Sequence, residues 1–123
     1  MTIKKTMYNG HIIAIIDSDQ PVITDTASAL DLVMSVRYET QTDLVAIRKE
    51  AVAESFFILS TGLAGDILQK FVNYGIKTAL FGDYSSYTSK PLRDFIYESN
   101  QGTTVAFVPT EEQAIDKLAS MSD

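Results

Sequence analysis

From residue 44 onward the chain alternates short apolar runs with longer amphipathic segments, and this alternation restricts the possible folds more than any other feature. The apolar runs at 44–47, 76–81 and 104–108 have the length and composition of buried strands. The segments between and after them repeat apolar residues every three or four positions, which is the period of a helix packed on one side. A strand–helix–strand order is typical of parallel strands joined by right-handed crossovers. We therefore predict an α/β fold.

The amino-terminal part is predicted to add an antiparallel hairpin to these strands. The Asn-Gly pair at 9–10 is the strongest short hairpin-turn signal, and it separates two strand-like runs, Lys4–Tyr8 and His11–Ile16. A helix then begins at a cap supplied by Asp25 or Thr26. The complete prediction is a mixed sheet of about five strands, antiparallel at first and then parallel, with about four helices.

Local signals place the ends of the later helices. The segment 63–73 is the clearest amphipathic helix, and Gly75 stands where a helix commonly ends. Ser89 can cap the next helix, with Pro91 just inside its start. Thr110 opens a capping-box pattern before the last helix.

Composition places the chain among ordinary globular domains. Its 123 residues are 46% hydrophobic and 21% charged, which suits a single domain over residues 1–123 with a real core. There is no cysteine, and the longest apolar run, Ile12–Ile16, is far too short for a membrane span. The net charge is −6, and the sequence has no basic cluster of the kind that nucleic-acid binding needs. These features predict a soluble cytoplasmic protein that contacts neither nucleic acid nor membrane.

Two hydroxyls and a glycine gather directly before the 63–73 helix, at Ser60, Thr61 and Gly62. A phosphate added here would lie at a helix amino terminus, where free amide groups and the helix dipole favour an anion. Ser60 and Thr61 are therefore phosphoacceptor candidates, and modification would add roughly −1.5 to −2 charges. In the alternative interpretation one of the two hydroxyls is simply the helix cap, and Gly62 permits close packing. Both interpretations remain open at this point.

The loop from Asp83 to Ser89 is the second candidate surface. It leaves the carboxyl end of a predicted strand and enters a helix, which is the edge where open α/β sheets gather ligands. Its tyrosines and hydroxyls suit either a small ligand or a protein partner, although a plain polar loop capped at Ser89 would give the same pattern. Together with the preceding turn, the binding candidates are Gly62, Asp83, Tyr84, Tyr87, Ser89, Arg93 and Asn100.

No arrangement in the sequence indicates a catalytic or metal site. His11 is the sole histidine, and no nucleophile–base pair can be placed around it. Phosphate-binding loops, dinucleotide fingerprints and nucleophile elbows are absent from the sequence. We therefore predict no catalytic residue, no metal and no cofactor.

Several short motifs, spread over most of the chain, carry a resemblance to a known family. The motifs are 20–23, 29–32, Phe56-Phe57, 59–65, 69–74, Gly82-Asp83 and 92–100. Together they resemble an uncharacterised bacterial family that is catalogued as a domain of unknown function, number 4180. The resemblance implies no particular activity.

A second, looser resemblance concerns the order of elements and the run 60–63, which opens a helix. Both are similar to the STAS domain, the fold of anti-sigma factor antagonists. In that family a partner kinase phosphorylates a Ser or Thr ahead of the same Gly-Leu pair and so switches binding. The resemblance implies Ser60 as the phosphoacceptor and Thr61 as the following hydroxyl. Where that family usually has Asp before the serine, this chain has Leu59.

Three functions from different classes are compatible with these features. The first is a non-enzymatic regulatory or protein-binding module of STAS-like type that acts through the surface around Ser60 and the 83–89 loop. It would be phospho-switched at Ser60 or Thr61, with a kinase or regulatory protein as partner. The second is a small ligand-binding protein or enzyme with a pocket at the 83–89 loop. The third is a subunit that forms a homodimer through Phe56, Phe57 or Tyr74. The sequence leaves open whether the two phenylalanines belong to the core or to an interface.

Overall fold

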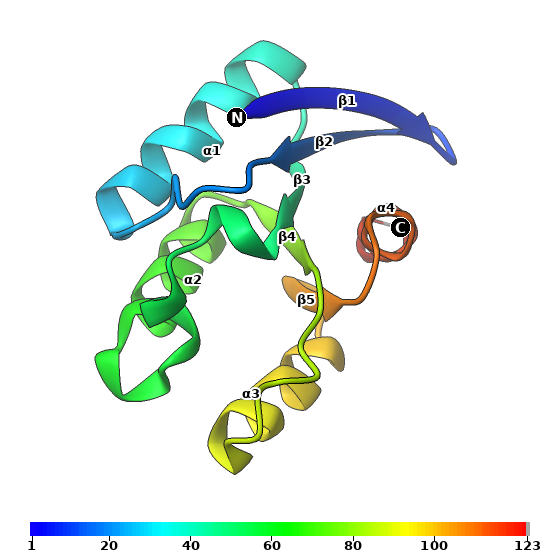
Figure 1. The fold of residues 1–123 in the computed structure, drawn as a ribbon. Coiled ribbons are helices and arrows are strands. Elements are labelled where there is room, and N and C mark those ends of the chain that lie inside the picture. The colour runs from blue at the N-terminus through cyan, green and yellow to red at the C-terminus, as the bar shows by residue number, and fades with distance from the viewer. Residues whose placement is uncertain (123) are drawn as a thin grey trace.

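A five-stranded mixed sheet forms the centre of the structure, a computed structural model that describes residues 1–122 (Figure 1). The strands lie side by side in chain order. β1 and β2 are antiparallel and the later pairings are parallel, as the sequence predicts. The strands are β1 (Thr2–Tyr8), β2 (His11–Asp17), β3 (Leu44–Arg48), β4 (Lys77–Phe81) and β5 (Val105–Val108).

Four α-helices connect and follow the strands in this part of the chain, which confirms the predicted fold class. They are α1 (Thr26–Thr40), α2 (Leu63–Asn73), α3 (Lys90–Asn100) and α4 (Glu111–Met121). Asp25 caps α1, because its carboxylate accepts the amide of Ser28 at 2.7 Å. Ser89 and Thr110 cap α3 and α4 as predicted. Across residues 1–122, no helix has the length and apolar character needed to cross a membrane.

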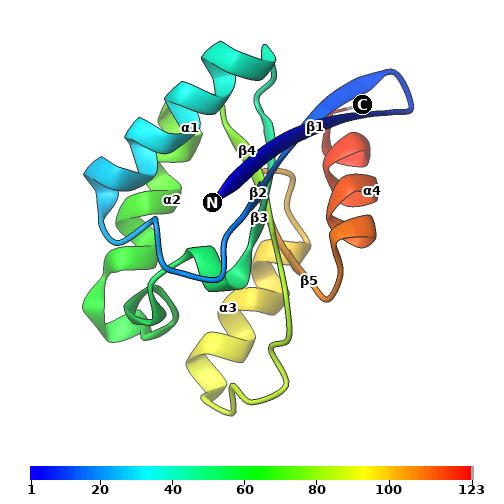
Figure 2. The ribbon, with the colours of Figure 1, turned by 45° about the horizontal axis from the view of Figure 1, so that its top comes forward.

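The helices divide unevenly between the two faces of the sheet (Figure 2). α1, α2 and α3 each join neighbouring parallel strands, so crossovers of one hand place all three on the same face. They share a buried cluster with sheet residues such as Ile47 and Leu80, whereas α4 packs on the opposite face against Ile15 and Phe81. The strand order never reverses, so the sheet lacks the switch point at which ligands of open α/β sheets usually bind. A site must therefore be built by loops.

Short helices fill the connection between β3 and α2, where the sequence shows no clear period. They are η1 (Lys49–Ala51), η2 (Glu54–Phe57) and η3 (Leu59–Thr61). Phe56 and Phe57 are only 2% and 4% exposed and pack in the core beneath α1, α2 and α3. The two phenylalanines are therefore core residues, and of the three residues considered for self-association only Tyr74 is exposed.

Thr78, in β4, is fully buried, and its hydroxyl has no hydrogen-bond partner among residues 1–122. An unpaired buried hydroxyl costs about 1–3 kcal/mol, and valine has nearly the same shape as threonine. We expect Thr78→Val to raise the free energy of unfolding by about 1 kcal/mol. Urea denaturation followed by circular dichroism measures this change.

Thr42 offers a matched control for this substitution. Its hydroxyl is also buried, but it donates to the carbonyl of Ile12 at 2.5 Å and accepts the amide of Leu44 at 3.2 Å. Thr42→Val would leave both backbone groups without this partner, so it should lower stability. A loss of similar size in Thr78→Val would show that the Thr78 hydroxyl contributes favourably, contrary to our expectation.

Candidate functional site

The Ser60 turn and the loop between β4 and α3 lie next to each other and line one groove of about 460 Å³. We call it the turn–loop groove. One wall comes from the short helices between β3 and α2, and the other comes from the loop and the first turn of α3. Two segments that are far apart in the sequence thus form one concave surface. The lining residues are Glu54, Phe57, Ile58, Leu59, Ser60, Ser86, Tyr87, Thr88, Ser89, Pro91 and Leu92.

A pair of stacked aromatic side chains joins the two walls. The rings of Phe57 and Tyr87 have centroids 5.2 Å apart and planes 21° from parallel. The hydroxyl of Tyr87 donates to Oε1 of Glu54 at 2.6 Å. Burial and the Glu54 carboxylate both raise the pKa of Tyr87, so the hydroxyl stays protonated and keeps donating. These contacts hold the loop against η2.

Lys49, at the start of η1, lies over the same two rings. Its Nζ is 4.9 Å from the ring centroid of Tyr87 and 5.6 Å from that of Phe57, which is the geometry of a cation–π contact. Gly82 allows the end of β4 to pass close to the stem of Lys49. Its φ is 158°, and a Cβ there would lie 2.7 Å from Cβ of Lys49. Lys49 is not among the residues predicted from sequence; the signal that points to it is a charged residue directly after a buried strand.

The structure distinguishes the two hydroxyls of the Ser60 turn. Ser60 is exposed on the rim of the groove. The Thr61 hydroxyl lies 2.9 Å from the carbonyls of Ser55 and Ile58, to either of which it can donate, and it accepts the amide of Leu63 at 3.2 Å. The N-cap residue of α2 is Gly62, so the expectation that Ser60 or Thr61 occupies the cap position is wrong. Gly62, which ends η3, has a left-handed conformation with φ 76°, and glycine adopts this conformation without strain.

A second hollow of about 400 Å³ borders the same loop and brings together four predicted binding residues. The four are Tyr84, Tyr87, Arg93 and Asn100. Three of them are already engaged, since the Tyr87 hydroxyl donates to Glu54. The hydroxyl of Tyr84 donates to the carbonyl of Leu80 at 3.0 Å, and burial raises the pKa of Tyr84. The carboxamide of Asn100 accepts the amide of Phe107 at 2.7 Å and donates to its carbonyl at 3.0 Å.

Asp83 and Ser89, the two ends of the loop, have different positions. The Asp83 carboxylate accepts the amide of Ser85 at 2.9 Å, and hydrogen bonding from Ser85 lowers the pKa of Asp83. Asp83 is exposed and lines neither hollow at the loop, so its observed contact is that of a turn former. Ser89 lines the turn–loop groove and also caps α3.

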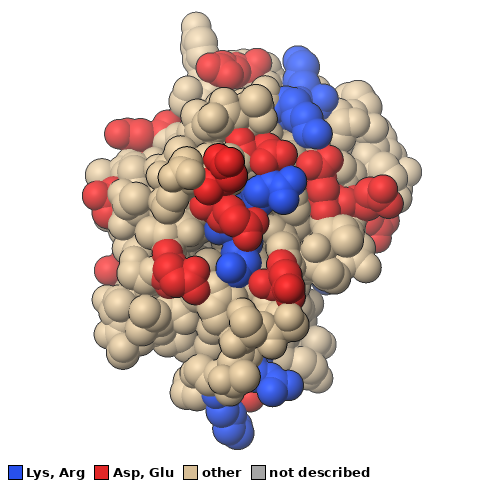
Figure 3. All heavy atoms as spheres, in the orientation of Figure 1, with Lys and Arg blue, Asp and Glu red and all other residues tan. Residues whose placement is uncertain are grey.

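Charged side chains of both signs gather near the carboxyl ends of β2 and β3. Arg48 forms a two-point pair with Asp17, with Nε 2.6 Å from Oδ1 and Nη2 3.2 Å from Oδ2. The guanidinium also lies 5.2 Å from the ring centroid of Phe81, and its hydrogen bonds lower the pKa of Asp17. Figure 3 shows acidic and basic side chains intermixed over the middle of this view. Neither Asp17 nor Arg48 lines a hollow at the loop.

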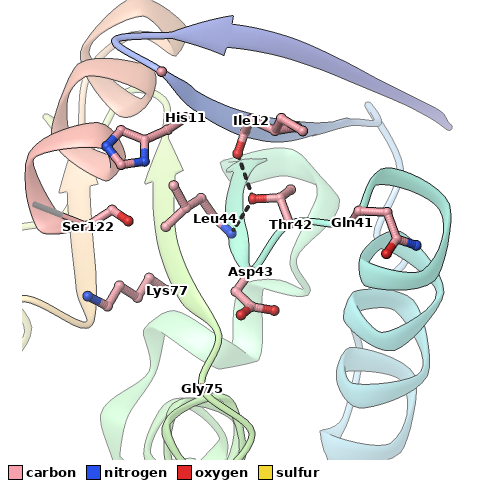
Figure 4. Close-up of a pocket in the computed structure, with 10 residues that line it drawn as sticks. His11, Ile12, Gln41, Thr42, Asp43, Leu44, Gly75, Lys77 and Ser122 are labelled. Carbon is pink, nitrogen blue, oxygen red and sulfur yellow. Dashed lines mark hydrogen bonds between the residues drawn. The ribbon is translucent and has the colours of Figure 1, made fainter.

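A hollow of about 410 Å³ lies at the other end of the strands, where β2 and β3 begin (Figure 4). The Thr42 hydroxyl bridges two backbone groups here, as the dashed lines show. Nζ of Lys77 donates to the carbonyl of Met121 at 2.7 Å, and Asp43 accepts from Nε of Arg37 at 2.5 Å. These polar atoms tie chain segments together, and the turn–loop groove remains the better candidate for a binding site.

Comparison with known proteins bears on the family. A family model described as a domain of unknown function (DUF4180) matches residues 8–118. No curated protein and no solved structure matches the chain. The comparisons do not confirm the resemblance to the STAS domain, which stays a prediction from the order of elements and the position of Ser60. Since the family match spans most of its length, the chain belongs to the DUF4180 family.

Proposed function

We propose that the protein is a non-enzymatic regulatory module that binds a segment of a partner protein in the turn–loop groove. The observation that carries this proposal is Ile58. Its side chain is 53% exposed although it follows the buried Phe57 directly, and it lines the groove. Leu59 is half-buried and lines the same groove, and neighbouring apolar side chains at a hollow are a feature of surfaces that contact other proteins.

The chemistry of the walls suggests which segment would fit. Apolar contacts are offered by Ile58 and Leu59, and hydroxyls of Ser86 and Thr88 offer hydrogen bonds. Glu54 is the one charged side chain among the lining residues. A basic group of the partner could pair with this carboxylate beside Tyr87. The expected occupant is therefore a segment in which an apolar side chain neighbours a Lys or Arg.

Phosphorylation of Ser60 would regulate this binding. The exposed rim position is accessible to a kinase, and the STAS resemblance implies the same residue. A phosphate would add roughly −1.5 to −2 charges and considerable bulk at the rim, which closes the groove to an apolar side chain. Mass spectrometry of the protein purified from its own cells should then find phosphate on Ser60. Consistent absence of the modification would remove the switch but leave the groove.

Selection of random peptides on the wild-type protein tests the groove. Enriched sequences should combine a large apolar residue with a Lys or Arg. The Kd of an enriched peptide, measured by fluorescence anisotropy, should rise about tenfold or more in Ile58→Glu, because a carboxylate replaces an apolar contact. Ser60→Asp, which supplies part of the charge of a phosphate, should weaken binding in the same direction.

Tyr38→Glu is the matched control for the anisotropy measurement. Tyr38 is 83% exposed on α1 and is not a lining residue of the groove, so its replacement should leave the Kd unchanged. Equal affinities of wild type and Ile58→Glu would contradict the proposal. So would a selection that enriches no peptide of the expected kind.

The second candidate function is binding of a small anionic ligand in the hollow of about 400 Å³ that Tyr84 and Arg93 line. The observation in its favour is that Arg93 is exposed there among aromatic side chains, in a space within the usual size of ligand sites. Arg93→Ala separates the two candidates, because it should abolish binding of a small anion and spare binding of the peptide. The engaged polar groups of Tyr84 and Asn100 make this candidate the weaker one.

A further inference from the structure

We propose that the protein forms a two-fold symmetric dimer in which β1 of one copy pairs antiparallel with β1 of a second copy. The sheet would then continue without a break through both molecules. This proposal concerns the edge of the sheet at β1, and it stands whether or not the turn–loop groove binds a peptide.

The two edges of the sheet differ in their hydrogen-bonding state. At the β5 edge, the carboxamide of Asn100 occupies both the amide and the carbonyl of Phe107. At the β1 edge, no side chain or backbone group among residues 1–122 bonds the outward groups of Ile3, Lys5 and Met7. A row of unpaired backbone groups is a template for another strand.

The hairpin turn determines which β1 residues face outward. Asn9 and Gly10 have φ values of 51° and 81°, the two positive angles of a type I′ turn. Such a turn follows a hydrogen-bonded pair, here Tyr8 with His11. Because bonded and non-bonded pairs alternate along an antiparallel ladder, Met7 and its alternate neighbours turn their backbone groups away from β2.

Two lysines decide the register of a second β1 strand. The registers with the longest overlap are centred on Lys4, Lys5 or Thr6. The first two place a lysine directly opposite its own copy, which is destabilising. Lysines on an edge strand commonly block pairing in this way. The register centred on Thr6 avoids the repulsion, because Lys5 then faces Met7 and Lys4 faces Tyr8.

Charge complementarity supports the register centred on Thr6. Tyr8 and Lys4 share the face of the sheet that α4 covers, since the Tyr8 hydroxyl donates to Asp116 at 2.9 Å and Lys4 pairs with Glu111 at 3.4 Å. A hollow of about 520 Å³ beside Tyr8 is lined in part by Asp116 and Glu112. Lys4 of the second copy would lie beside the carboxylates of this hollow. By symmetry the same contact forms twice.

Cross-linking tests the register directly, because the natural chain has no cysteine. Thr6 would face Thr6 of the second copy in a non-bonded pair, where Cα atoms lie about 4.5 Å apart. That separation suits a disulfide. Under mild oxidation Thr6→Cys should give a covalent dimer rapidly on a non-reducing gel, whereas Lys4→Cys and Lys5→Cys should not. Faster cross-linking at either lysine position, or equally slow cross-linking at all three, would overturn the proposal.

Substitution of Met7 provides a second test in the full chain without any cross-link. Met7 is 65% exposed, so either charge should be compatible with folding, which circular dichroism verifies. In sedimentation velocity, Met7→Lys should raise the Kd of the dimer about tenfold. The new lysine of each copy would lie opposite Lys5 of the other copy, so the repulsion occurs twice. Met7→Glu should lower the Kd. A monomeric wild type at high concentration, or equal effects of the two charges, would refute the pairing.

Discussion

Replacing Phe57 with alanine is expected to lower the free energy of unfolding by about 3–5 kcal/mol. Phe57 is 4% exposed, and its ring contacts Phe56 edge-to-face at 5.0 Å as well as stacking on Tyr87. A third aromatic contact, to Tyr84 at 5.9 Å, fastens the loop before α3. Removal of the ring leaves a cavity among these side chains and frees the loop. Urea denaturation followed by circular dichroism measures the loss.

Ile58→Ala is the neighbouring control for this prediction. Ile58 is exposed, so its truncation removes little buried surface and should change stability only slightly. The Phe57 variant should also weaken peptide binding, because Tyr87 loses its stacking partner in the groove wall. A stability loss no larger than that of Ile58→Ala would show that the aromatic cluster does not hold η2 and the loop together.

Asn100→Ala is expected to lower the free energy of unfolding by about 2–6 kcal/mol, since two backbone groups of Phe107 lose their partner and each costs about 1–3 kcal/mol. Asn100 ends α3, and its two hydrogen bonds to Phe107 fasten the helix to β5. Its carboxamide makes the two backbone hydrogen bonds that a neighbouring strand would make. A single substitution would therefore act on both the end of α3 and the β5 edge of the sheet. The measurement is again equilibrium unfolding in urea.

Two further variants show whether the paired hydrogen bonds are responsible. Asn100→Asp keeps an acceptor for the Phe107 amide but sets a carboxylate oxygen against the Phe107 carbonyl, so it should also be destabilising. Gln101→Ala, at the adjacent exposed position, should be nearly neutral. If Asn100→Ala were as mild as the Gln101 variant, water must satisfy Phe107 without cost, and the assigned role would be wrong.

The fold could be predicted where local signals are strong. The Asn-Gly turn at 9–10, the cap at Ser89 and the cap at Thr110 each depend on residues close in sequence. The alternation of strands and helices after residue 44 then predicts that the later strands pair in parallel, as they do. Propensity and spacing were sufficient because each element satisfies its own local preference.

The segment between β3 and α2 could not be predicted in the same way. Short 3-10 helices have no amphipathic period to detect, and the burial of Phe57 depends on Tyr84 and Tyr87, which come much later in the chain. One of the two interpretations of the Ser60 turn places a hydroxyl at the cap of α2, because Ser and Thr are preferred there. The left-handed end of η3 instead favours Gly62.

The segments of the candidate site could be predicted from the sequence, but the contacts that join them could not. The sequence suggests one functional surface around Ser60 and the loop that holds Tyr87, and both residues line the turn–loop groove. Glu54 and Lys49 were missed because their roles come from contacts with Tyr87, which only the tertiary fold creates. Asn100 is predicted from sequence as a partner- or ligand-binding residue, and no local signal indicates that its carboxamide bonds the backbone of Phe107 in β5.

The carboxamide of Asn100 also limits how large an assembly can grow. A strand added at β1 brings a second molecule whose own far edge is again occupied at Phe107. Growth by strand addition therefore stops after one step, whereas a sheet with two open edges could elongate into a fibre. In the proposed dimer, one side chain at the end of α3 would thus make assembly through the sheet finite.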